Sequence, residues 1–330
     1  MKWEAEMRKL DELYATFVLP ALDCNLNCAY CVIKQRNEAS TSELTAEDYI
    51  RFFKEILIDL KIRRFSIQGY EPLLPETWPL TKELLQIAGA FFCESSVITN
   101  GTYLAEHAQE LGSFPGLVDS LTVSLDGDRA EVHDKLRRTT GCFDAALGGL
   151  RAVSREFRGI LMVNSVLFPG KTDYLARMPE LLSQVGVREW AISPYIHVGK
   201  KTKVPNQVQM REDLLYLTGK ASIYGIKVYL SDELRRMDGT DLYKDFYVRG
   251  LGVDEGIFRL SPDGSCSRGQ EILTTSKTSP MWDRTEAPAA FLRRIFAEKD
   301  WDMQRRNVFA RTIRRWHAHS QFRQYWKGGD

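Results

Sequence analysis

The sequence alternates short runs of β-branched and aromatic residues with longer segments in which apolar residues recur at helical spacing. The runs that predict strands are residues 14–20, 64–68, 95–99, 120–125, 160–167, 189–193 and 227–230. The amphipathic segments that predict helices are residues 46–60, 78–90, 103–111, 142–157, 173–185 and 211–224. This alternation of strand and helix predicts an α/β fold with a parallel sheet, arranged as a partial or complete barrel.

The rhythm stops after residue 230, where a second region begins. Residues 231–254 are mixed in character and predict loops, whereas residues 256–265 predict a strand that runs into a turn at Pro262-Asp263-Gly264. Residues 287–296 and 302–316 predict two final helices. We therefore expect one domain over residues 1–230 and an extension over residues 231–330.

Composition and charge exclude several classes of partner. The 330 residues include 45 Lys and Arg against 44 Asp and Glu, which gives a net charge of +1. This balance predicts neither nucleic acid nor an anionic membrane as a partner. No apolar run approaches the ~20 residues of a membrane span, and the charged N-terminus lacks the apolar core of a signal peptide. We therefore expect a cytoplasmic protein.

Three closely spaced cysteines after the first predicted strand indicate a metal centre. Cys24, Cys28 and Cys31 form a C-x3-C-x2-C loop, and clustered thiolates bind soft metals and iron–sulfur clusters. A cubane cluster takes four ligands, so three thiolates leave one iron open, which usually signals chemistry. The alternatives are a zinc site completed by His133 or Cys93, or a cluster that only transfers electrons.

Polar segments also end most of the other predicted strands. They are Gln68–Pro72, Thr99–Gly101, Ser124–Gly127, Asn164 within the fifth strand, and Ser193–Tyr195. Because active sites of parallel α/β sheets form at the carboxyl ends of the strands, we expect these segments to share one rim with the cysteine loop.

Over residues 14 to 200, this order of motifs resembles the radical S-adenosylmethionine (radical SAM) superfamily. Gly69-Tyr70-Glu71-Pro72, Thr99-Asn100-Gly101 and Ser124-Leu125-Asp126-Gly127 make it similar to the SPASM/twitch branch in particular. The resemblance implies a partial (β/α)6-type barrel with a short C-terminal α/β extension. It also implies one [4Fe-4S] cluster held by Cys24, Cys28 and Cys31, with S-adenosylmethionine on the open iron.

The resemblance further implies which residues contact S-adenosylmethionine. Gly69, Tyr70 and Glu71 would match the segment near the methionine amino group, and Ser124 and Asp126 the ribose contacts. Arg137, with Arg138 beside it, would face the methionine carboxylate. Asn164 would add a further contact, and Tyr30 would shield the cluster near the adenine. These residue types suit the task, because a zwitterionic ligand needs acceptors for its ammonium and a cation for its carboxylate.

Two departures from the branch pattern affect the interpretation. Tyr70 replaces the usual second glycine, so its hydroxyl is a candidate for contact with the substrate. The extension contains Cys266 as its single cysteine, so we expect no auxiliary cluster. Cys266 is either a buried structural residue or a hydrogen-atom donor to a substrate radical. His197, which follows the sixth predicted strand, is another candidate catalytic residue, whereas Cys93 and Cys142 are expected to be buried.

These features predict a radical SAM enzyme that acts on a small polar metabolite of natural-product (antibiotic) biosynthesis, such as a sugar, aminosugar or nucleoside-like molecule. The substrate can be anionic, and an external one-electron reductant of the flavodoxin or ferredoxin type is required. Decarboxylation or elimination, epimerisation and dehydrogenation are the expected outcomes, so both lyase and oxidoreductase classes stay open. The rival hypotheses are a peptide-modifying radical SAM enzyme and a non-catalytic zinc or iron–sulfur protein.

Overall fold

The computed structural model describes residues 14–19, 24–31, 44–113, 118–168, 170–195, 207–231, 247–249, 257–268 and 280–297. The strands are β1 (Tyr14–Phe17), β2 (Arg64–Ile67), β3 (Glu94–Thr99), β4 (Ser120–Ser124), β5 (Ile160–Leu167), β6 (Glu189–Pro194), β7 (Lys227–Ser231), β8 (Tyr247–Arg249), β9 (Ile257–Leu260) and β10 (Cys266–Arg268). The helices are α3 (Ala46–Leu60), α4 (Trp78–Ala90), α5 (Leu104–Ser113), α6 (Ala130–Arg137), α7 (Cys142–Glu156), α8 (Met178–Gln184), α9 (Gln207–Ile223) and α11 (Pro288–Ala297). None of these described helices is both long enough and apolar enough to span a membrane.

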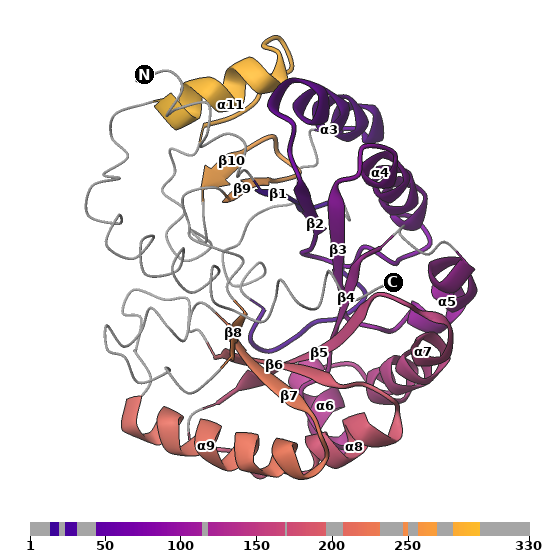
Figure 1. Ribbon diagram of the computed structural model, residues 1–330, viewed down its shortest axis with the longest axis vertical. Coiled ribbons are helices and arrows are strands. Elements are labelled where there is room, and N and C mark those ends of the chain that lie inside the picture. The colour runs from indigo at the N-terminus through magenta and orange to yellow at the C-terminus, as the bar shows by residue number, and fades with distance from the viewer. Residues whose placement is uncertain are drawn as a thin grey trace, which may run out of the picture.

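The strands form one curved sheet with most of the helices along its outer side (Figure 1). Its order is β10-β9-β1-β2-β3-β4-β5-β6-β7-β8, so β10 and β8 are the two edges in the described part of the chain. Neighbouring strands are parallel throughout, except that β10 runs antiparallel to β9. The open parallel sheet confirms the predicted α/β class and the partial barrel.

Helix α3 shows how the sequence fixes the outer layer. The Thr45 hydroxyl accepts a hydrogen bond from the Asp48 backbone N–H, while the Asp48 side chain accepts one from the Thr45 N–H. This reciprocal cap starts the helix where the sequence predicts. The helix then buries Phe52 and Phe53 against Phe17 of β1.

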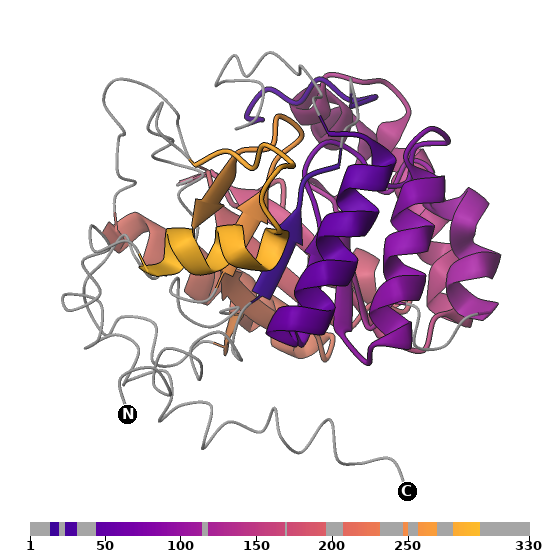
Figure 2. The ribbon, with the colours of Figure 1, turned by 90° about the horizontal axis from the view of Figure 1, so that it is seen from above.

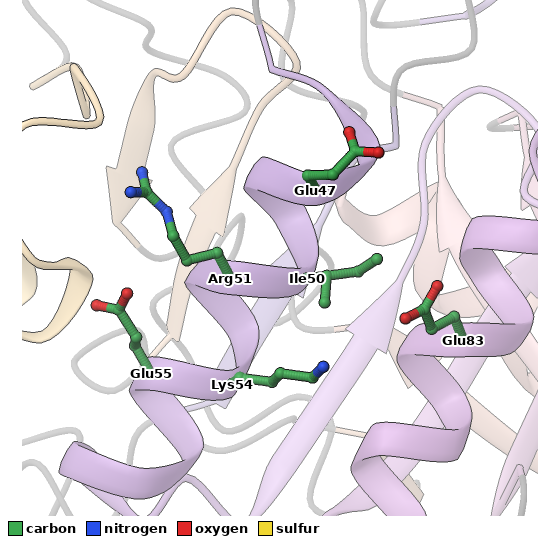
Figure 3. A pocket seen from close by; sticks show the side chains of 6 residues that line it. All are labelled: Glu47, Ile50, Arg51, Lys54, Glu55 and Glu83. Carbon is green, nitrogen blue, oxygen red and sulfur yellow. The ribbon is translucent and has the colours of Figure 1, made fainter.

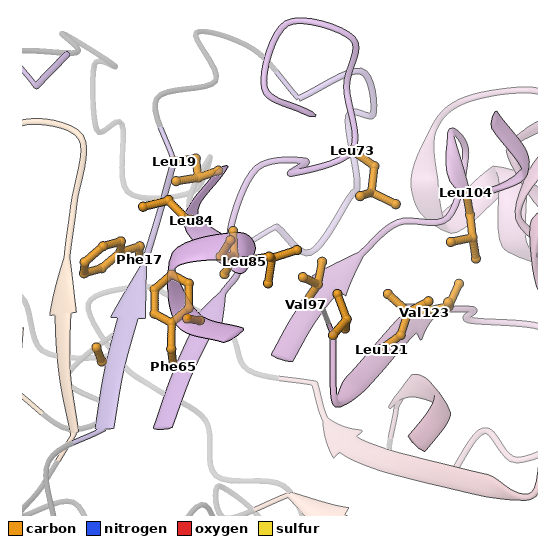
Figure 4. Close-up of a cluster of buried hydrophobic side chains, with 14 of the residues drawn as sticks. Phe17, Leu19, Phe65, Leu73, Leu84, Leu85, Val97, Leu104, Leu121 and Val123 are labelled. Atoms are coloured by element: carbon orange, nitrogen blue, oxygen red, sulfur yellow. The ribbon is translucent and has the colours of Figure 1, made fainter. Parts of the chain in front are cut away.

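The hydrophobic core lies between the sheet and the outer helices (Figure 4). Alternate strand residues such as Phe17, Phe65, Val97 and Val123 enter this core, because successive side chains of a strand point to opposite faces. The intervening residues therefore face the concave side of the sheet, which is the side that the expected active site requires.

The C-terminal region extends the same sheet. Strand β9 pairs in parallel with β1, and Arg259 of β9 lies opposite Thr16 of β1. Trp282 packs edge-on against Phe52 of α3, with the ring centroids 4.8 Å apart. Helix α11 lies beside α3 (Figure 2). The division into domains at residue 230 stays a prediction, and the second predicted helix at residues 302–316 lies outside the described residues.

Four details differ from the sequence-based expectation. The helix predicted at residues 173–185 begins only at Met178, because the Tyr174 hydroxyl bonds to the backbone of Val166 and Phe168 and holds the preceding residues in turns. Helix α6 was not predicted. Strand β8 lies within the segment expected to form loops, and β10 completes a hairpin after the predicted turn.

The side chain of Asp134, in α6, caps the amino-terminal end of α7. Its carboxylate accepts hydrogen bonds from the backbone N–H groups of Gly141 at 2.6 Å and Phe143 at 2.8 Å, and from the Cys142 thiol. Burial acts to raise the pKa of Asp134, but these hydrogen bonds outweigh it and lower the pKa below its ordinary value of 3.8. The carboxylate therefore caps a helix whose own cap residue, Gly141, has no side chain.

We predict that Asp134→Ala lowers the free energy of unfolding by about 1 kcal/mol at pH 7, as the loss of a helix cap does. A lowered folded-state pKa stabilises the fold above the unfolded pKa, so the contribution should be complete above pH 4 and disappear as the pH falls further. Urea unfolding at several pH values measures it. The control Asp144→Ala, an exposed change in the first turn of the same helix, should have a smaller effect.

Candidate active site

The segments singled out by the sequence meet at the carboxyl edge of the sheet. The cysteine loop follows β1, Glu71 follows β2, Asn100 follows β3 and Asp126 follows β4. Contacts between segments far apart in the chain confirm the shared rim. Asn100 reaches Cys24, and Asp126 accepts a hydrogen bond from the Tyr30 hydroxyl.

The loop cysteines differ from the other cysteines in exposure. The partly exposed ones are Cys24, Cys28 and Cys31, and the buried ones are Cys93, Cys142 and Cys266. The loop is anchored by Leu26, whose side chain is buried, and by a 2.9 Å hydrogen bond from the Ala29 N–H to the Leu136 carbonyl at the end of α6. Three accessible sulfurs in one anchored loop are what a cluster needs as ligands.

A buried ion pair lies directly behind this loop. Arg137 Nη2 is 2.5 Å from Asp126 Oδ2, and both side chains are almost completely buried. Arg137 Nη1 also donates to the Cys28 sulfur at 3.6 Å, and its guanidinium lies over the Tyr30 ring at 5.5 Å. The same pair of residues therefore contacts both a candidate ligand and the aromatic residue beside it.

The second oxygen of Asp126 is also bound by the chain, because Oδ1 accepts the Val166 backbone N–H at 2.8 Å. The Asp126 backbone N–H donates to His133 Nδ1 at 3.0 Å. The carboxylate thus joins the end of β4 to β5, the cysteine loop and α6. Its expected contact with the ribose stays a prediction.

Charge and burial shift the pKa of several of these groups. Burial raises the pKa of the Tyr30 hydroxyl well above its ordinary value, and the Asp126 carboxylate adds to that shift. Burial alone would lower the pKa of Arg137, but Asp126 and Tyr30 raise it well above its ordinary value. Burial raises the pKa of the Cys28 thiol despite the neighbouring arginine. Arg137 is therefore a permanent cation beside the loop.

The turn after β2 combines backbone strain with a buried carboxylate. Gly69 and Tyr70 both have positive φ, at 85° and 40°, so the tyrosine adopts the conformation that its side chain disfavours. Glu71 is 1% exposed. Its Oε1 accepts the Leu73 N–H at 2.9 Å and the Thr99 hydroxyl at 2.6 Å, and its Oε2 accepts the Asn100 N–H at 2.6 Å. In this structure Glu71 joins two rim loops.

Two further rim residues lie side by side. Ser124 at the end of β4 is paired in register with Asn164 of β5, and the Asn164 side-chain oxygen accepts the Ser193 hydroxyl at 2.8 Å. Beyond them, Phe168 stacks on Tyr195 with ring centroids 4.7 Å apart and contacts the Tyr30 ring edge-on. Sequence reasoning missed Phe168, whose signal is an aromatic residue directly after a predicted strand.

The residues present fit the implied cofactors. The three loop thiols supply soft donors for a [4Fe-4S] cluster. Arg137 Nε is buried and has no hydrogen-bond partner in the described residues, so a donor is left for the carboxylate of S-adenosylmethionine. Among the described residues, no group of three or more His, Cys, Asp and Glu side chains is placed to hold a single metal ion.

The zinc alternative gains no support from the proposed fourth ligands. Cys93 directly precedes β3, so it lies at the amino edge of the parallel sheet, opposite the rim that holds the cysteine loop. His133 is fully buried, with Nδ1 bonded to the Asp126 N–H. Burial lowers the His133 pKa to about 4, so its ring is neutral at pH 7.

The remaining candidates lie away from this cluster of contacts or outside the described residues. Cys266 is 1% exposed and belongs to the hydrophobic core, in register with Leu260 on the helix-facing side of the sheet. Arg138 is exposed and ends α6 in a left-handed conformation. His197 lies outside the described residues. Their functional roles stay predictions.

An open depression between α3 and α4 lies on the outer, helix-covered side of the sheet (Figure 3). It is lined by Glu47, Ile50, Arg51, Lys54, Glu55 and Glu83. Charged groups of both signs dominate it, and none of the rim residues takes part. The rim, and not this depression, is therefore the candidate active site.

The structure makes a prediction for the pH dependence of stability through Glu71. Burial raises its pKa from 4.5 to about 7 in the folded protein. Between these values the folded state binds one proton more than the unfolded chain, so stability should fall as the pH rises, by on the order of 3 kcal/mol. Glu71→Gln should remove this contribution to the change of the free energy of unfolding with pH.

Glu71→Gln should also lower stability at every pH by about 1–3 kcal/mol, because an amide N–H₂ would face a backbone N–H donor. Thermal unfolding from pH 4.5 to 8 measures both effects. The matched control is Glu106→Gln, an exposed change on α5 that should alter neither. If stability changes with pH in Glu71→Gln as it does in the wild type, the raised pKa of Glu71 is contradicted.

Comparison with known proteins agrees with this geometry. The model of the radical SAM superfamily matches residues 18–181, a span that contains the cysteine loop, Glu71, Asp126, Arg137 and Asn164. A GTP 3′,8-cyclase of Picosynechococcus sp. is 30% identical over 178 residues, or 51% of each chain. An AdoMet-dependent heme synthase of Methanosarcina barkeri is 27% identical over 177 residues, or 54% of this chain and 49% of that protein. The chain thus matches about half the length of these relatives.

Solved structures share the fold at low sequence identity. Streptococcus suis SuiB bound to S-adenosylmethionine has a TM-score of 0.66 at 14% identity, over 90% of this chain and 69% of that one. The anSMEcpe structure with bound AdoMet has a TM-score of 0.63 at 17% identity, over 84% and 80%. Assignment to the SPASM/twitch branch stays a prediction.

Proteins of the matched family use a [4Fe-4S] cluster held by three cysteines together with S-adenosylmethionine, and these are the cofactors of this chain. The motif order, the open parallel sheet and the matched span lead to the same conclusion: the chain carries a radical SAM domain in residues 18–181 and belongs to the radical SAM superfamily of enzymes.

Proposed function

We propose that this chain takes a hydrogen atom from a small polar metabolite by radical SAM chemistry. The observation that carries the proposal is that three partly exposed cysteines lie in one loop at the rim and that the buried cation of Arg137 contacts one of them, Cys28. In this proposal Cys24, Cys28 and Cys31 hold the cluster. With one electron from an external reductant, the bound cofactors would supply methionine and a 5′-deoxyadenosyl radical, which would take a hydrogen atom from a C–H bond of the substrate.

The chain's own residues bind and orient the cofactor and the substrate. Arg137 carries the donor for a carboxylate, and its pairing with Asp126 fixes that donor in place. Ser124 and Asn164 offer a hydroxyl and an amide to a ribose. The turn at Gly69 and Tyr70 offers backbone groups to an ammonium. Tyr30, whose hydroxyl is held by Asp126, shields the cluster from water.

The concave face of the sheet supports a polar substrate. Thr16, Ser66, Ser96 and Ser120 are paired in register across β1 to β4, and Arg259 of β9 continues the row opposite Thr16. Complete barrels fill this interior with bulky branched side chains. A row of hydroxyls ending in a cation instead makes this interior polar, although the Ser96 hydroxyl already bonds to the Phe65 carbonyl and to the Tyr14 hydroxyl. A polar interior with a cation at its end is better matched to a polar, anionic substrate than to an apolar one.

The extension bears on the net reaction. Cys266 lies on the helix-facing side of β10 and not on the concave side. This placement favours elimination over epimerisation by a Cys266 hydrogen donor, although dehydrogenation is compatible if the electron returns to the cluster. We propose that residues 1–230 form the catalytic domain and that residues 231–330 cover its mouth.

A purine nucleotide is the first substrate to test within this class. The matched relatives include several proteins named GTP 3′,8-cyclase, which by that name act on GTP. A peptide substrate is the rival. The structure of SuiB with its precursor peptide SuiA shares only the fold with this chain at 14% identity, so it does not favour a peptide here.

We predict that protein reconstituted anaerobically with iron and sulfide converts S-adenosylmethionine to 5′-deoxyadenosine when dithionite is added. Cys28→Ala should reduce the product to the level of a protein-free sample. The control Cys93→Ala, a buried change at the opposite edge of the sheet, should retain the product. A stable cluster with no 5′-deoxyadenosine would reject the proposed function.

We also predict that a small anionic metabolite stimulates this conversion and that precursor peptides do not. Chromatography of 5′-deoxyadenosine measures the response to GTP, to other nucleotides and to sugar phosphates, each at saturating concentration. Arg259→Ala should raise the half-saturating concentration of the stimulating compound. Saturable stimulation by a peptide alone would overturn the assignment of the substrate class.

A further inference from the structure

The Asn100 side chain lies against the first cysteine of the loop. Asn100 directly follows β3 and is 6% exposed. Its Nδ2 group donates a long hydrogen bond of 3.9 Å to the Cys24 sulfur and a bond of 2.8 Å to the Asn25 side-chain oxygen. A single amide therefore contacts both a cluster ligand and the residue beside it.

The orientation of this amide is fixed by its neighbours. The Asn100 Oδ1 accepts the Thr102 backbone N–H at 2.9 Å and the Thr102 hydroxyl at 2.6 Å. Because a backbone N–H can only donate, the amide oxygen must face Thr102, which leaves the N–H₂ group facing the cysteine loop. The Thr102 hydroxyl also accepts from Asn25 Nδ2 at 2.9 Å and so closes a ring of three side chains.

The backbone of Asn100 is held by a hydrogen bond to the buried carboxylate of Glu71. The Asn100 N–H donates to Glu71 Oε2 at 2.6 Å, while Oε1 of the same carboxylate holds Leu73 and Thr99. The loops after β2 and β3 are therefore joined through Glu71, next to the Asn100 side chain. This support leaves Asn100 little freedom to turn away from Cys24.

An N–H group directed at a ligand sulfur changes the properties of a cluster. Hydrogen bonds to the sulfurs stabilise the added negative charge of the reduced cluster, and residues around the ligands fix the ligand geometry. Cys28 receives such a bond from the charged Arg137 at 3.6 Å, whereas the donor to Cys24 is a neutral amide.

We infer that Asn100 is a positioning residue for Cys24, which orients the Cys24–Asn25 end of the loop and raises the reduction potential of the cluster through its N–H···S hydrogen bond. The inference rests on the proposed function only in that Cys24 is a ligand. It assigns to the polar Thr99-Asn100-Gly101 segment a role separate from the binding of S-adenosylmethionine.

The test compares the midpoint potential of the reconstituted cluster in the wild type, Asn100→Ala and Asn100→Asp. Redox titration followed by electron paramagnetic resonance gives the potential, and chemical analysis gives the iron per chain. Asn100→Asp keeps the oxygen that faces Thr102 but replaces the donor. Asn100→Ala removes the donor without adding charge. Both should shift the potential to more negative values, with equal or lower iron content.

Controls separate this role from a general loss of structure. Gln86→Ala removes an exposed amide from α4 and should leave the potential unchanged. Thr102→Val keeps the backbone N–H that donates to the Asn100 oxygen but removes the hydroxyl donor. It should therefore shift the midpoint potential by less than Asn100→Ala does. Circular dichroism establishes that each variant is folded. A folded Asn100→Ala that loses its iron also supports the positioning role.

The outcomes distinguish this inference from the proposed function. If Asn100→Ala and Asn100→Asp keep the wild-type potential, spectrum and iron content, the role of Asn100 is rejected while the radical enzyme stands. If the wild type itself binds no iron–sulfur cluster, the proposed function fails, and this inference fails with it.

Discussion

The buried ion pair between Arg137 and Asp126 is the contact on which the rest of the site depends. Burying two charges is costly unless further hydrogen bonds satisfy them, and removing one partner from such a pair typically costs about 3–5 kcal/mol. Here the carboxylate is satisfied by Tyr30, Val166 and the arginine itself. The pair thereby joins the end of β4, the strand β5, the helix α6 and the cysteine loop.

This constraint explains why the cysteine loop has a defined place although it contains no helix or strand. Arg137 contacts Cys28 from one side, the Ala29 N–H bonds to the last turn of α6, and Asn100 contacts Cys24 from the end of β3. Two of these anchors come from the end of α6, and the third comes from the residue that follows β3. The loop is consequently positioned by the carboxyl edge of the sheet as a whole.

Much of the fold was predictable because its signals are local. Short runs of β-branched and aromatic residues mark β1 to β6, and the Thr45–Asp48 cap marks the start of α3. Helix α6 escaped prediction for a physical reason. The residues it buries fully are His133 and Arg137, which are polar, and its apolar residues Val132 and Leu136 are only partly buried, so the helix is too short and too polar to show a clear apolar pattern. Strand β8 has three residues, too few for a pattern.

The residues of the site were predictable by type more than by contact. The spacing of Cys24, Cys28 and Cys31 indicated the cluster, but the sequence contained no sign that Asp126 and Arg137 pair with each other. The expected place of Glu71 beside S-adenosylmethionine stays a prediction, and nothing in the sequence indicated that its carboxylate bonds Leu73, Thr99 and Asn100. Such contacts join residues far apart in the chain, so they follow from the packing of whole strands.

The central claim is that three sulfurs hold a cubane whose fourth iron is open to S-adenosylmethionine. Electron paramagnetic resonance of the reduced, anaerobically reconstituted protein tests it most directly, with spectra recorded before and after S-adenosylmethionine is added. The account predicts about four irons per chain and a clear change in the cluster spectrum on addition. A spectrum that S-adenosylmethionine leaves unaltered, or bound zinc in place of iron, would contradict it.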